Sequence, residues 1–465
     1  MIDSILFKRF GENIAAITDD GSSYQYNEIF NFIKELGKVL EPRSLVFSLS
    51  DNSIGSLVGY FAFLFNKTPP LILDSKINNE KINDLINIYD PKYIWIEKGK
   101  FGSLNKGNVV KKLLDYCLVE ISTKSESMLN EDLALLLTTS GSTGSPKLVK
   151  LSYDNIYSNA KSISSYLKID YKEKPITSLP MHYSFGLSII NSHIIKGSTL
   201  LLTNSSIMEK RFWEFLKLEK ATSLSGVPYT FLLLKKLRFF KMDLPHLGTL
   251  TQAGGKLSDD LTKDFSNFCF KTEKSFIIMY GQTEASPRMS YLPHKDSIKK
   301  LGSIGVPIPG GEFSLIDEKE NVIYQDNIIG ELVYKGENVS MGYAESNKDL
   351  SIGDENKGIL YTGDIAKKDE DGYYYIIGRK KRFIKLFGNR INLDETEELV
   401  KKIVSECACL GQDDKMVIYI EEKKRIEDVK EFISAQLRIN SLAFIVKYID
   451  QIPKNSSGKT LYKNL

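Results

Sequence analysis

Strand and helix patterns alternate along the first part of the chain. Apolar runs typical of buried strands cover residues 14–18, 44–50, 69–74 and 92–97, and amphipathic helix patterns cover residues 26–40, 56–65 and 79–89. Two parallel strands need a crossover connection, usually a helix, so this alternation indicates parallel sheets covered by helices. The same alternation resumes with a helix over 153–167 and strands over 175–179 and 198–202. The sequence therefore predicts an α/β fold with two layered α/β sheets.

The pattern changes at Gly302. Short strand patterns rich in glycine and tyrosine follow at 311–316, 330–334 and 372–377, and a basic connector then covers 378–385. The last part of the chain has mixed helix and strand patterns and is long enough for a compact domain of its own. We predict an N-terminal domain over residues 1–380 with a small β subdomain at about 302–378, an α+β C-terminal domain over 383–465 and a hinge near Lys381.

Composition narrows the classes of function. The chain has 465 residues, 42% of them hydrophobic, and its 62 Lys and Arg residues nearly balance 59 Asp and Glu residues, for a net charge of +3. This balance predicts neither a nucleic-acid partner nor attraction to a membrane surface. The sequence has no signal-peptide pattern and no apolar run long enough to span a membrane, and its four cysteines lack metal-ligand spacing. We expect a cytoplasmic globular protein with reduced thiols.

A loop of small hydroxylated residues is the first candidate for chemistry. The buried-strand pattern that begins at Leu135 runs directly into Ser140, Gly141, Ser142, Thr143, Gly144 and, three residues later, Lys147. Glycine lets backbone N–H groups approach an anion, and hydroxyl and ammonium groups add donors, so the loop is typical of a phosphate cradle. A solvated turn is the alternative. The sequence contains no GxxxxGK[ST] motif, and Pro453 stands where the nearest imitation needs its first glycine, which disfavours a P-loop ATPase or kinase.

Five further stretches carry residues suited to nucleotide chemistry, and their order matters more than any one of them. They are Ala-Gly-Gly at 253–255, Tyr-Gly-Gln-Thr-Glu at 280–284, Tyr-Thr-Gly-Asp at 361–364, Gly-Arg at 378–379 and the segment 453–459. With this set, the chain resembles the superfamily of adenylate-forming enzymes, which includes acyl-CoA and aryl-CoA synthetases, adenylation domains of nonribosomal peptide synthetases, and luciferases. The resemblance extends from Tyr24 to Lys459. It implies that a carboxylate attacks the α-phosphorus of ATP to give an acyl-adenylate and pyrophosphate, and that a thiol then captures the acyl group.

The resemblance also implies roles for individual residues. The cradle would hold the β- and γ-phosphates, Thr283 the α-phosphate, and Glu284 a Mg²⁺ ion with Thr139 as a second ligand. Asp364 would accept hydrogen bonds from both ribose hydroxyls with Arg379 beside it, and Lys459 would enter from a mobile C-terminal domain to bridge the carboxylate and the α-phosphate. The remaining nucleotide contacts would come from Gly254, Gly255, Tyr280, Gly281 and Gln282.

The acid pocket and the acceptor are less determined. The segment 179–188 supplies Tyr183, Ser184, Gly186 and Ser188 as pocket residues, and it lacks the Phe-Asp-x-Ser pattern of amino-acid-activating members. We therefore expect a carboxylic acid without a free α-ammonium group, since a buried ammonium needs a carboxylate partner. Lys381, Lys385 and Gly388 match the hinge and thiol-tunnel positions. The thiol would belong to CoA or to a phosphopantetheinyl carrier protein. A stand-alone amino-acid adenylation enzyme and an inactive nucleotide-binding homologue remain alternatives.

Overall fold

The computed structural model describes residues 4–103, 107–121, 128–138, 147–386, 389–437, 439–454 and 460–465. The chain forms two compact units, which are described separately. The first consists of Met1–Leu301, Gly305–Glu312 and Lys335–Leu360, and the second of Gly302–Ile304, Phe313–Tyr334 and Tyr361–Leu465.

The first unit contains a nine-stranded sheet with a parallel centre. Its strand order is β16-β15-β14-β13-β12-β10-β11-β1-β2, and the strands from β14 through β10 and β11 to β1 are parallel to their neighbours. The strands are β1 (Ile14–Thr18), β2 (Ser23–Gln25), β10 (Pro175–Ile176), β11 (Leu200–Leu202), β12 (Ser223–Gly226), β13 (Thr249–Gln252), β14 (Ser275–Gly281), β15 (Arg288–Leu292) and β16 (Val306–Pro307).

An eight-stranded sheet forms the other half of this unit, in the order β20-β9-β8-β4-β3-β5-β7-β6. Its members are β3 (Val46–Ser50), β4 (Pro70–Asp74), β5 (Tyr93–Glu97), β6 (Asn108–Leu113), β7 (Tyr116–Glu120), β8 (Leu133–Thr138), β9 (Leu148–Ser152) and β20 (Gly342–Ala344). Strands β5, β3, β4 and β8 pair in parallel, as the alternation of strand and helix patterns predicts. The predicted α/β fold class is confirmed.

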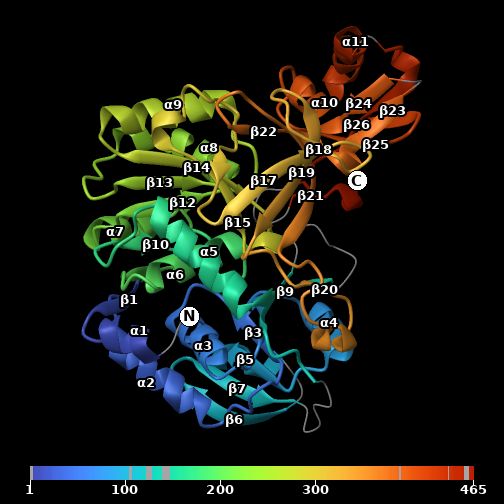
Figure 1. The fold of residues 1–465 in the computed structure, drawn as a ribbon. Helices are drawn as coiled ribbons and strands as arrows, with labels where there is room; N and C mark the ends of the chain where they lie inside the picture. Colours follow the sequence, from blue (N-terminus) through green and yellow to red (C-terminus); the bar gives the residue numbers. More distant parts are fainter. Residues whose placement is uncertain are drawn as a thin grey trace. The chain divides into compact units, whose positions relative to one another are not determined.

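Helices cover both faces of both sheets, as seen in Figure 1. They are α1 (Ser4–Arg9), α2 (Tyr26–Gly37), α3 (Ile54–Phe65), α4 (Asn79–Tyr89), α5 (Tyr153–Tyr166), α6 (Ser184–Ile194), α7 (Lys210–Leu218), α8 (Pro228–Lys236) and α9 (Asp259–Lys271). Local sequence fixes where α5 starts, because Ser152 caps its N-terminus. The Ser152 hydroxyl accepts a hydrogen bond from the N–H of Asn155, and the Asn155 side chain accepts one from the N–H of Ser152.

Helix α6 lies between the two sheets and connects their cores. Leu187, Ile190 and Ile194 pack in the core with α3 and the eight-stranded sheet, whereas Phe185 and Ile189 pack against the nine-stranded sheet. All of its residues are buried, including the polar residues Asn191 and His193. The segment predicted to form the acid pocket is therefore the central helix of this unit.

The second unit joins a five-stranded sheet, in which β17 pairs with β18 and β21 with β22 in antiparallel fashion, to the C-terminal part of the chain. The sheet has the order β18-β17-β19-β21-β22 and consists of β17 (Gly311–Ile316), β18 (Val322–Ile323), β19 (Ile329–Gly336), β21 (Ile359–Lys368) and β22 (Tyr374–Arg379). The C-terminal part contains β23 (Phe383–Leu386), β24 (Asn389–Asn392), α10 (Leu393–Val400), β25 (Cys407–Gln412), β26 (Lys415–Ile420), α11 (Ile426–Leu437) and β27 (Phe444–Tyr448). The domain boundary near residues 380–383 stays a prediction.

Candidate active site

The Tyr-Gly-Gln-Thr-Glu motif lies where β14 ends. Tyr280 and Gly281 are its last strand residues, Tyr280 and Gln282 are half-buried, and a 3₁₀ turn over Thr283–Ala285 follows. Gly281 is opposite Arg288 on β15, and a Cβ at Gly281 would lie 1.7 Å from the carbonyl oxygen of Pro287. Only glycine fits here, so the tight return from β14 to β15 fixes where Thr283 and Glu284 project.

Glu284 is held by a tyrosine that sequence reasoning missed. The hydroxyl of Tyr343 on β20 donates to Glu284 Oε1 across 2.9 Å, and burial together with the Glu284 charge raises the pKa of Tyr343 well above its usual value, so it stays a donor. The Nζ of Lys147 lies 3.7 Å from the centre of the Tyr343 ring. Tyr343 thus connects the predicted metal ligand to the last residue of the predicted cradle.

Thr283 is in direct contact with the predicted acid pocket. Its Oγ1 lies 3.1 Å from Ser184 Oγ on the first turn of α6. Gly186 has no room for a side chain, because a Cβ there would be 2.2 Å from the carbonyl oxygen of Pro180. The hydroxyl of Ser188, one turn further along α6, donates to the Phe185 carbonyl across 2.7 Å.

The Ala-Gly-Gly motif meets the same helix. Gly254 has φ +85°, and a Cβ there would come within 2.6 Å of the Tyr183 hydroxyl, so both conformation and space require glycine. Gly255 is exposed, and its carbonyl accepts from Gln252 Nε2 across 2.9 Å. Tyr183 therefore lies beside Gly254, and the assignment of both residues to the site stays a prediction.

Asp364 and Arg379 form an ion pair in the second unit. They are opposite each other on β21 and β22, with Arg379 Nε 3.2 Å from Asp364 Oδ1. The side chain of Asp364 is 4% exposed, whereas that of Arg379 is 64% exposed. A buried carboxylate with an exposed cationic partner is suited to exchange part of that contact for ligand hydroxyl groups.

The connector around Lys381 divides two sets of contacts. Lys380 forms an ion pair of 2.7 Å with Glu331 on β19, whereas Arg382 contacts Asp394 at 2.7 Å and Glu397 at 2.5 Å in the C-terminal part. Lys381 between them is exposed. Lys385 is also exposed, and its N–H donates to Asp413.

Several predicted site residues lie outside the described part of the chain. They are Thr139, Ser140, Gly141, Ser142, Thr143, Gly144, Gly388 and Lys459. Their roles stay predictions.

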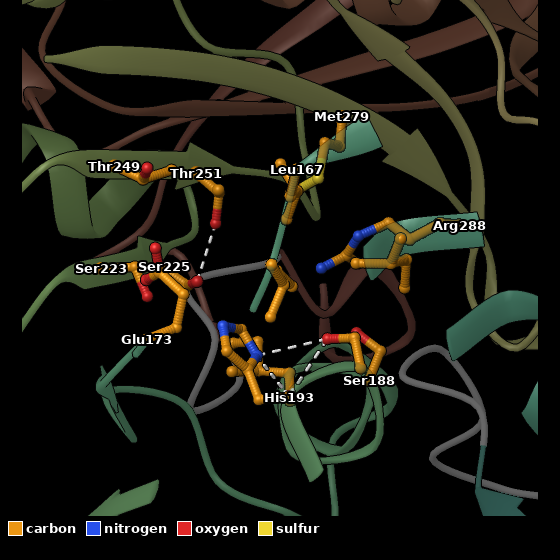
Figure 2. Close-up of a pocket in the computed structure, with 14 residues that line it drawn as sticks. Leu167, Glu173, Ser188, His193, Ser223, Ser225, Thr249, Thr251, Met279 and Arg288 are labelled. Atoms are coloured by element: carbon orange, nitrogen blue, oxygen red, sulfur yellow. Dashed lines mark hydrogen bonds between the residues drawn. The ribbon is translucent and has the colours of Figure 1, made fainter. Parts of the chain in front are cut away.

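A small polar cavity, which the sequence did not reveal, adjoins Ser188. It has a volume of about 20 Å³ and lies between α5, α6 and strands β12–β14 (Figure 2), with Glu173, Ser188, His193, Met279 and Arg288 among its lining residues. Burial lowers the pKa of His193 to about 4, so its imidazole is neutral at pH 7, and its Nδ1 pairs with the Ile189 carbonyl at 2.8 Å. Glu173 accepts from the Thr222 hydroxyl, and burial raises its pKa. Ser188 was predicted as a pocket residue, whereas the other four come from stretches without a motif, so no local signal marked them.

The donor set fits a magnesium nucleotide. Mg²⁺ binds to oxygen ligands through one or two carboxylates together with substrate phosphates. Glu284 supplies one carboxylate, and within the described residues no cluster of three or more His, Cys, Asp or Glu side chains offers a site for a more fully protein-bound ion. Thr283, Tyr343 and Lys147 add the hydroxyl and ammonium donors that phosphate oxygens require.

Comparison with known proteins identifies the family of the chain. The family model for AMP-binding enzymes matches residues 7–344, so the chain belongs to the family of AMP-binding enzymes, within the adenylate-forming superfamily. The chain is 30% identical to a long-chain-fatty-acid–CoA ligase of Escherichia coli over 72% of its own length and 61% of that protein. It is 28% identical to probable 4-coumarate–CoA ligase 1 of Dictyostelium discoideum, over 76% and 65% respectively. The chain thus spans less than two thirds of the length of these two relatives.

Two further matches extend over nearly the whole chain. The 2-succinylbenzoate–CoA ligase of Oceanobacillus iheyensis is 25% identical over 96% of this chain and 95% of that protein. The structure of O-succinylbenzoate coenzyme A synthetase from Bacillus subtilis in complex with AMP has a TM-score of 0.80 at 20% identity, covering 99% of this chain and 97% of that chain. The same enzyme in complex with ATP and magnesium ion gives a TM-score of 0.78 at 21% identity, over 99% and 98%. Both structures show a shared fold.

Among the described residues, no helix is both long and apolar enough to cross a bilayer.

Proposed function

We propose that this chain is an AMP-forming acid–thiol ligase, which activates a small-molecule carboxylic acid with ATP and Mg²⁺ and then passes the acyl group to a thiol. The observation that carries the proposal is the contact of 3.1 Å between Thr283 and Ser184. It joins the motif assigned to the α-phosphate to the first turn of the helix assigned to the acid pocket. A carboxylate beside Ser184 therefore lies next to the residue that binds the phosphorus it attacks.

Each residue assigned to the site has a part in the first half-reaction. ATP supplies the adenylyl group, and Mg²⁺ offsets the charge on its phosphates. Glu284, oriented by Tyr343, would hold the metal ion together with Thr139, and Lys147 with the loop 140–146 would hold the β- and γ-phosphates. Asp364 would accept from the ribose hydroxyls, and Lys459 would stabilise the negative charge that builds on the reacting oxygens.

CoA is the proposed acceptor, because the relatives over most of the chain are named CoA ligases. A phosphopantetheinyl carrier protein is the second acceptor to test. The four cysteines are free and buried, which supports a reducing compartment such as the cytoplasm.

Pyrophosphate release with a panel of carboxylic acids tests the first half-reaction. The panel pairs each α-amino acid with its deaminated analogue, so that it distinguishes the proposed ligase from an amino-acid adenylation enzyme. Release that depends on acid, ATP and Mg²⁺ is the expected result, followed by AMP and thioester formation when CoA is added. An inactive nucleotide-binding homologue would bind ATP and release no pyrophosphate with any acid.

Glu284→Gln provides the matched test of the site. Removing the charge is expected to lower Mg²⁺-dependent release by about 100-fold, as for other losses of electrostatic stabilisation. Glu214→Gln is the control, because Glu214 is an exposed glutamate paired with Lys210 on α7. Equal activity of the two variants would contradict the assignment of Glu284 to the metal.

A further inference from the structure

Arg288 is a buried charge without an acidic partner. It is 3% exposed at the start of β15, and its Nε is buried with no hydrogen-bond partner in the described chain. No carboxylate of the described residues is among the groups that act on its charge. The groups that act on its charge are the phenols of Tyr166, which also accepts a hydrogen bond from it, and Tyr183; burial raises the pKa of both, so they are neutral at pH 7. An arginine guanidinium does not lose its proton under ordinary conditions, so the side chain stays charged although it is buried.

The backbone holds this charge in place. The Arg288 N–H donates to Asn159 Oδ1 at 3.4 Å, and its carbonyl accepts from Asn159 Nδ2 and Asn338 Nδ2, each at 2.9 Å. The guanidinium carbon lies 3.8 Å from the centre of the Phe185 ring. This contact with the ring face stabilises a cation but accepts no N–H in the plane of the guanidinium. The arginine is therefore fixed at its base, its guanidinium is hydrogen-bonded to the Tyr166 hydroxyl, and its buried Nε has no acceptor within the described chain.

The Arg288 guanidinium lines the cavity beside Ser188. Figure 2 shows its nitrogen atoms directed toward the side chains of Leu167 and Ser188, with His193 below and Glu173 beyond His193. The Glu173 carboxylate is occupied by the Thr222 hydroxyl. An anionic group that enters the cavity thus finds its complementary charge on the Arg288 side.

The helix sets the distance from this charge to the reaction centre. Ser184 contacts Thr283, and Ser188 lines the cavity one turn later on α6. Four residues of α-helix rise about 6 Å. A cavity of about 20 Å³ has room for roughly one water, which suits the end of a small acid and not a long acyl chain.

We propose that Arg288 binds a second carboxylate of the acid, so that the substrate is an extended dicarboxylic acid of about the length of glutarate or adipate. The inference rests on the proposed function and assigns the substrate class of that same site. One carboxylate reacts beside Ser184 and Thr283, and the other turns the Arg288 guanidinium from the face of Phe185 into an in-plane, two-pronged ion pair. The same positive charge repels an ammonium group, so it disfavours binding of an acid with a free ammonium group.

Matched pairs of acids test the proposal. Glutarate is compared with valerate and adipate with hexanoate, so that each pair replaces only the distal carboxylate by a methyl group. In ATP–pyrophosphate exchange we expect kcat/KM for the diacid to exceed that for the matched monoacid by at least about tenfold. We expect Arg288→Met to lower kcat/KM for the diacid by about 100-fold and to change kcat/KM for the monoacid little. Arg288→Lys is expected to retain part of the preference.

Arg43→Met is the matched control. Arg43 is another arginine whose Nε is buried without a partner in the described chain, and it is anchored to the Leu133 carbonyl at 3.0 Å outside the cavity. Its replacement is expected to leave the diacid preference unchanged. Preference of the wild type for the monoacid, or equal losses for both acids in Arg288→Met, would overturn the inference.

Binding separates failure of the inference from failure of the proposed function. Sulfamoyl-adenosine analogues that carry a glutaryl or a valeryl group are titrated calorimetrically against the wild type and the variants. Tighter binding of the glutaryl analogue that is lost in Arg288→Met supports the inference. Equal binding of both analogues contradicts only the role of Arg288 and leaves the proposed adenylate formation standing. Absence of binding of either analogue contradicts both adenylate formation and the role of Arg288.

Discussion

The hydroxyl of Tyr343 donates a hydrogen bond of 2.9 Å to Glu284 Oε1, although 59 residues separate the two in the chain. Strand β20 carries Tyr343 and pairs with β9, the strand that directly follows the predicted phosphate loop. The tyrosine is therefore placed between the loop exit and the carboxylate assigned to Mg²⁺, where it acts as a positioning residue for Glu284.

Tyr343→Phe tests this positioning role. The variant keeps the ring that Lys147 contacts but removes the donor to Glu284, and a hydrogen bond to a charged group contributes about 1.5 kcal/mol or more. We expect the Mg²⁺ concentration for half-maximal pyrophosphate release to rise roughly tenfold, with a smaller change in the saturated rate. Tyr324→Phe, which alters a tyrosine that is 80% exposed, is the control. An unchanged Mg²⁺ dependence would show that the tyrosine is not needed to orient the carboxylate.

Lys459→Ala should separate the two half-reactions. The resemblance assigns this lysine to adenylate formation only, since the C-terminal domain is expected to turn before the thiol reacts. We expect a loss of about 100-fold or more in pyrophosphate release and near-normal thioester formation from a supplied acyl-adenylate. Lys463→Ala, four residues later, should leave both steps intact. Equal losses in both steps would rule out the assigned role.

Lys381→Pro should act on the second half-reaction. Lys380 is tied to Glu331, and Arg382 is tied to Glu397, so Lys381 is the residue between two anchored neighbours. Proline fixes φ and removes an N–H, which opposes rotation at this position. We expect thioester formation to fall roughly tenfold or more while adenylate formation is retained. Lys381→Ala is the control for loss of the side chain, and normal rates of both steps in the proline variant would place the pivot elsewhere.

His193 should make stability fall as the pH is lowered. Its pKa is about 4 in the folded protein against an ordinary value of 6.5, so between these values the unfolded chain binds more protons. The resulting loss in the free energy of unfolding on acidification from pH 6.5 to 4 is about 3 kcal/mol for this group.

Urea unfolding across this range provides the measurement. On acidification from pH 6.5 to 4, the free energy of unfolding of the wild type should fall by about 3 kcal/mol more than that of His193→Gln, whatever the stability of the variant at pH 7. His246→Gln, which replaces an exposed histidine, should follow the wild type. Parallel pH profiles for the wild type and His193→Gln would contradict a buried neutral imidazole.

The sequence by itself determined the fold class and the family. Parallel α/β sheets follow from the alternation of apolar strands with amphipathic helices, because that pattern is local and recurs along the chain. The motifs are equally local: the Gly281 turn that positions Thr283 and Glu284 needs only a few adjacent residues. The pairing of Asp364 with Arg379 was foreseen as a shared role, and β21 and β22 place the two side chains in contact.

Tertiary structure decided what depends on segments far apart in the chain. Tyr343 reaches Glu284 only because β20 pairs with β9, and a short strand carries no signal of its partner. The burial of Arg288 depends on α5 and α6 closing over β15, so its sequence position gave no sign of an unpaired charge. Side-chain burial and strand pairing are properties of the packed chain, whereas helix and turn patterns are properties of neighbouring residues.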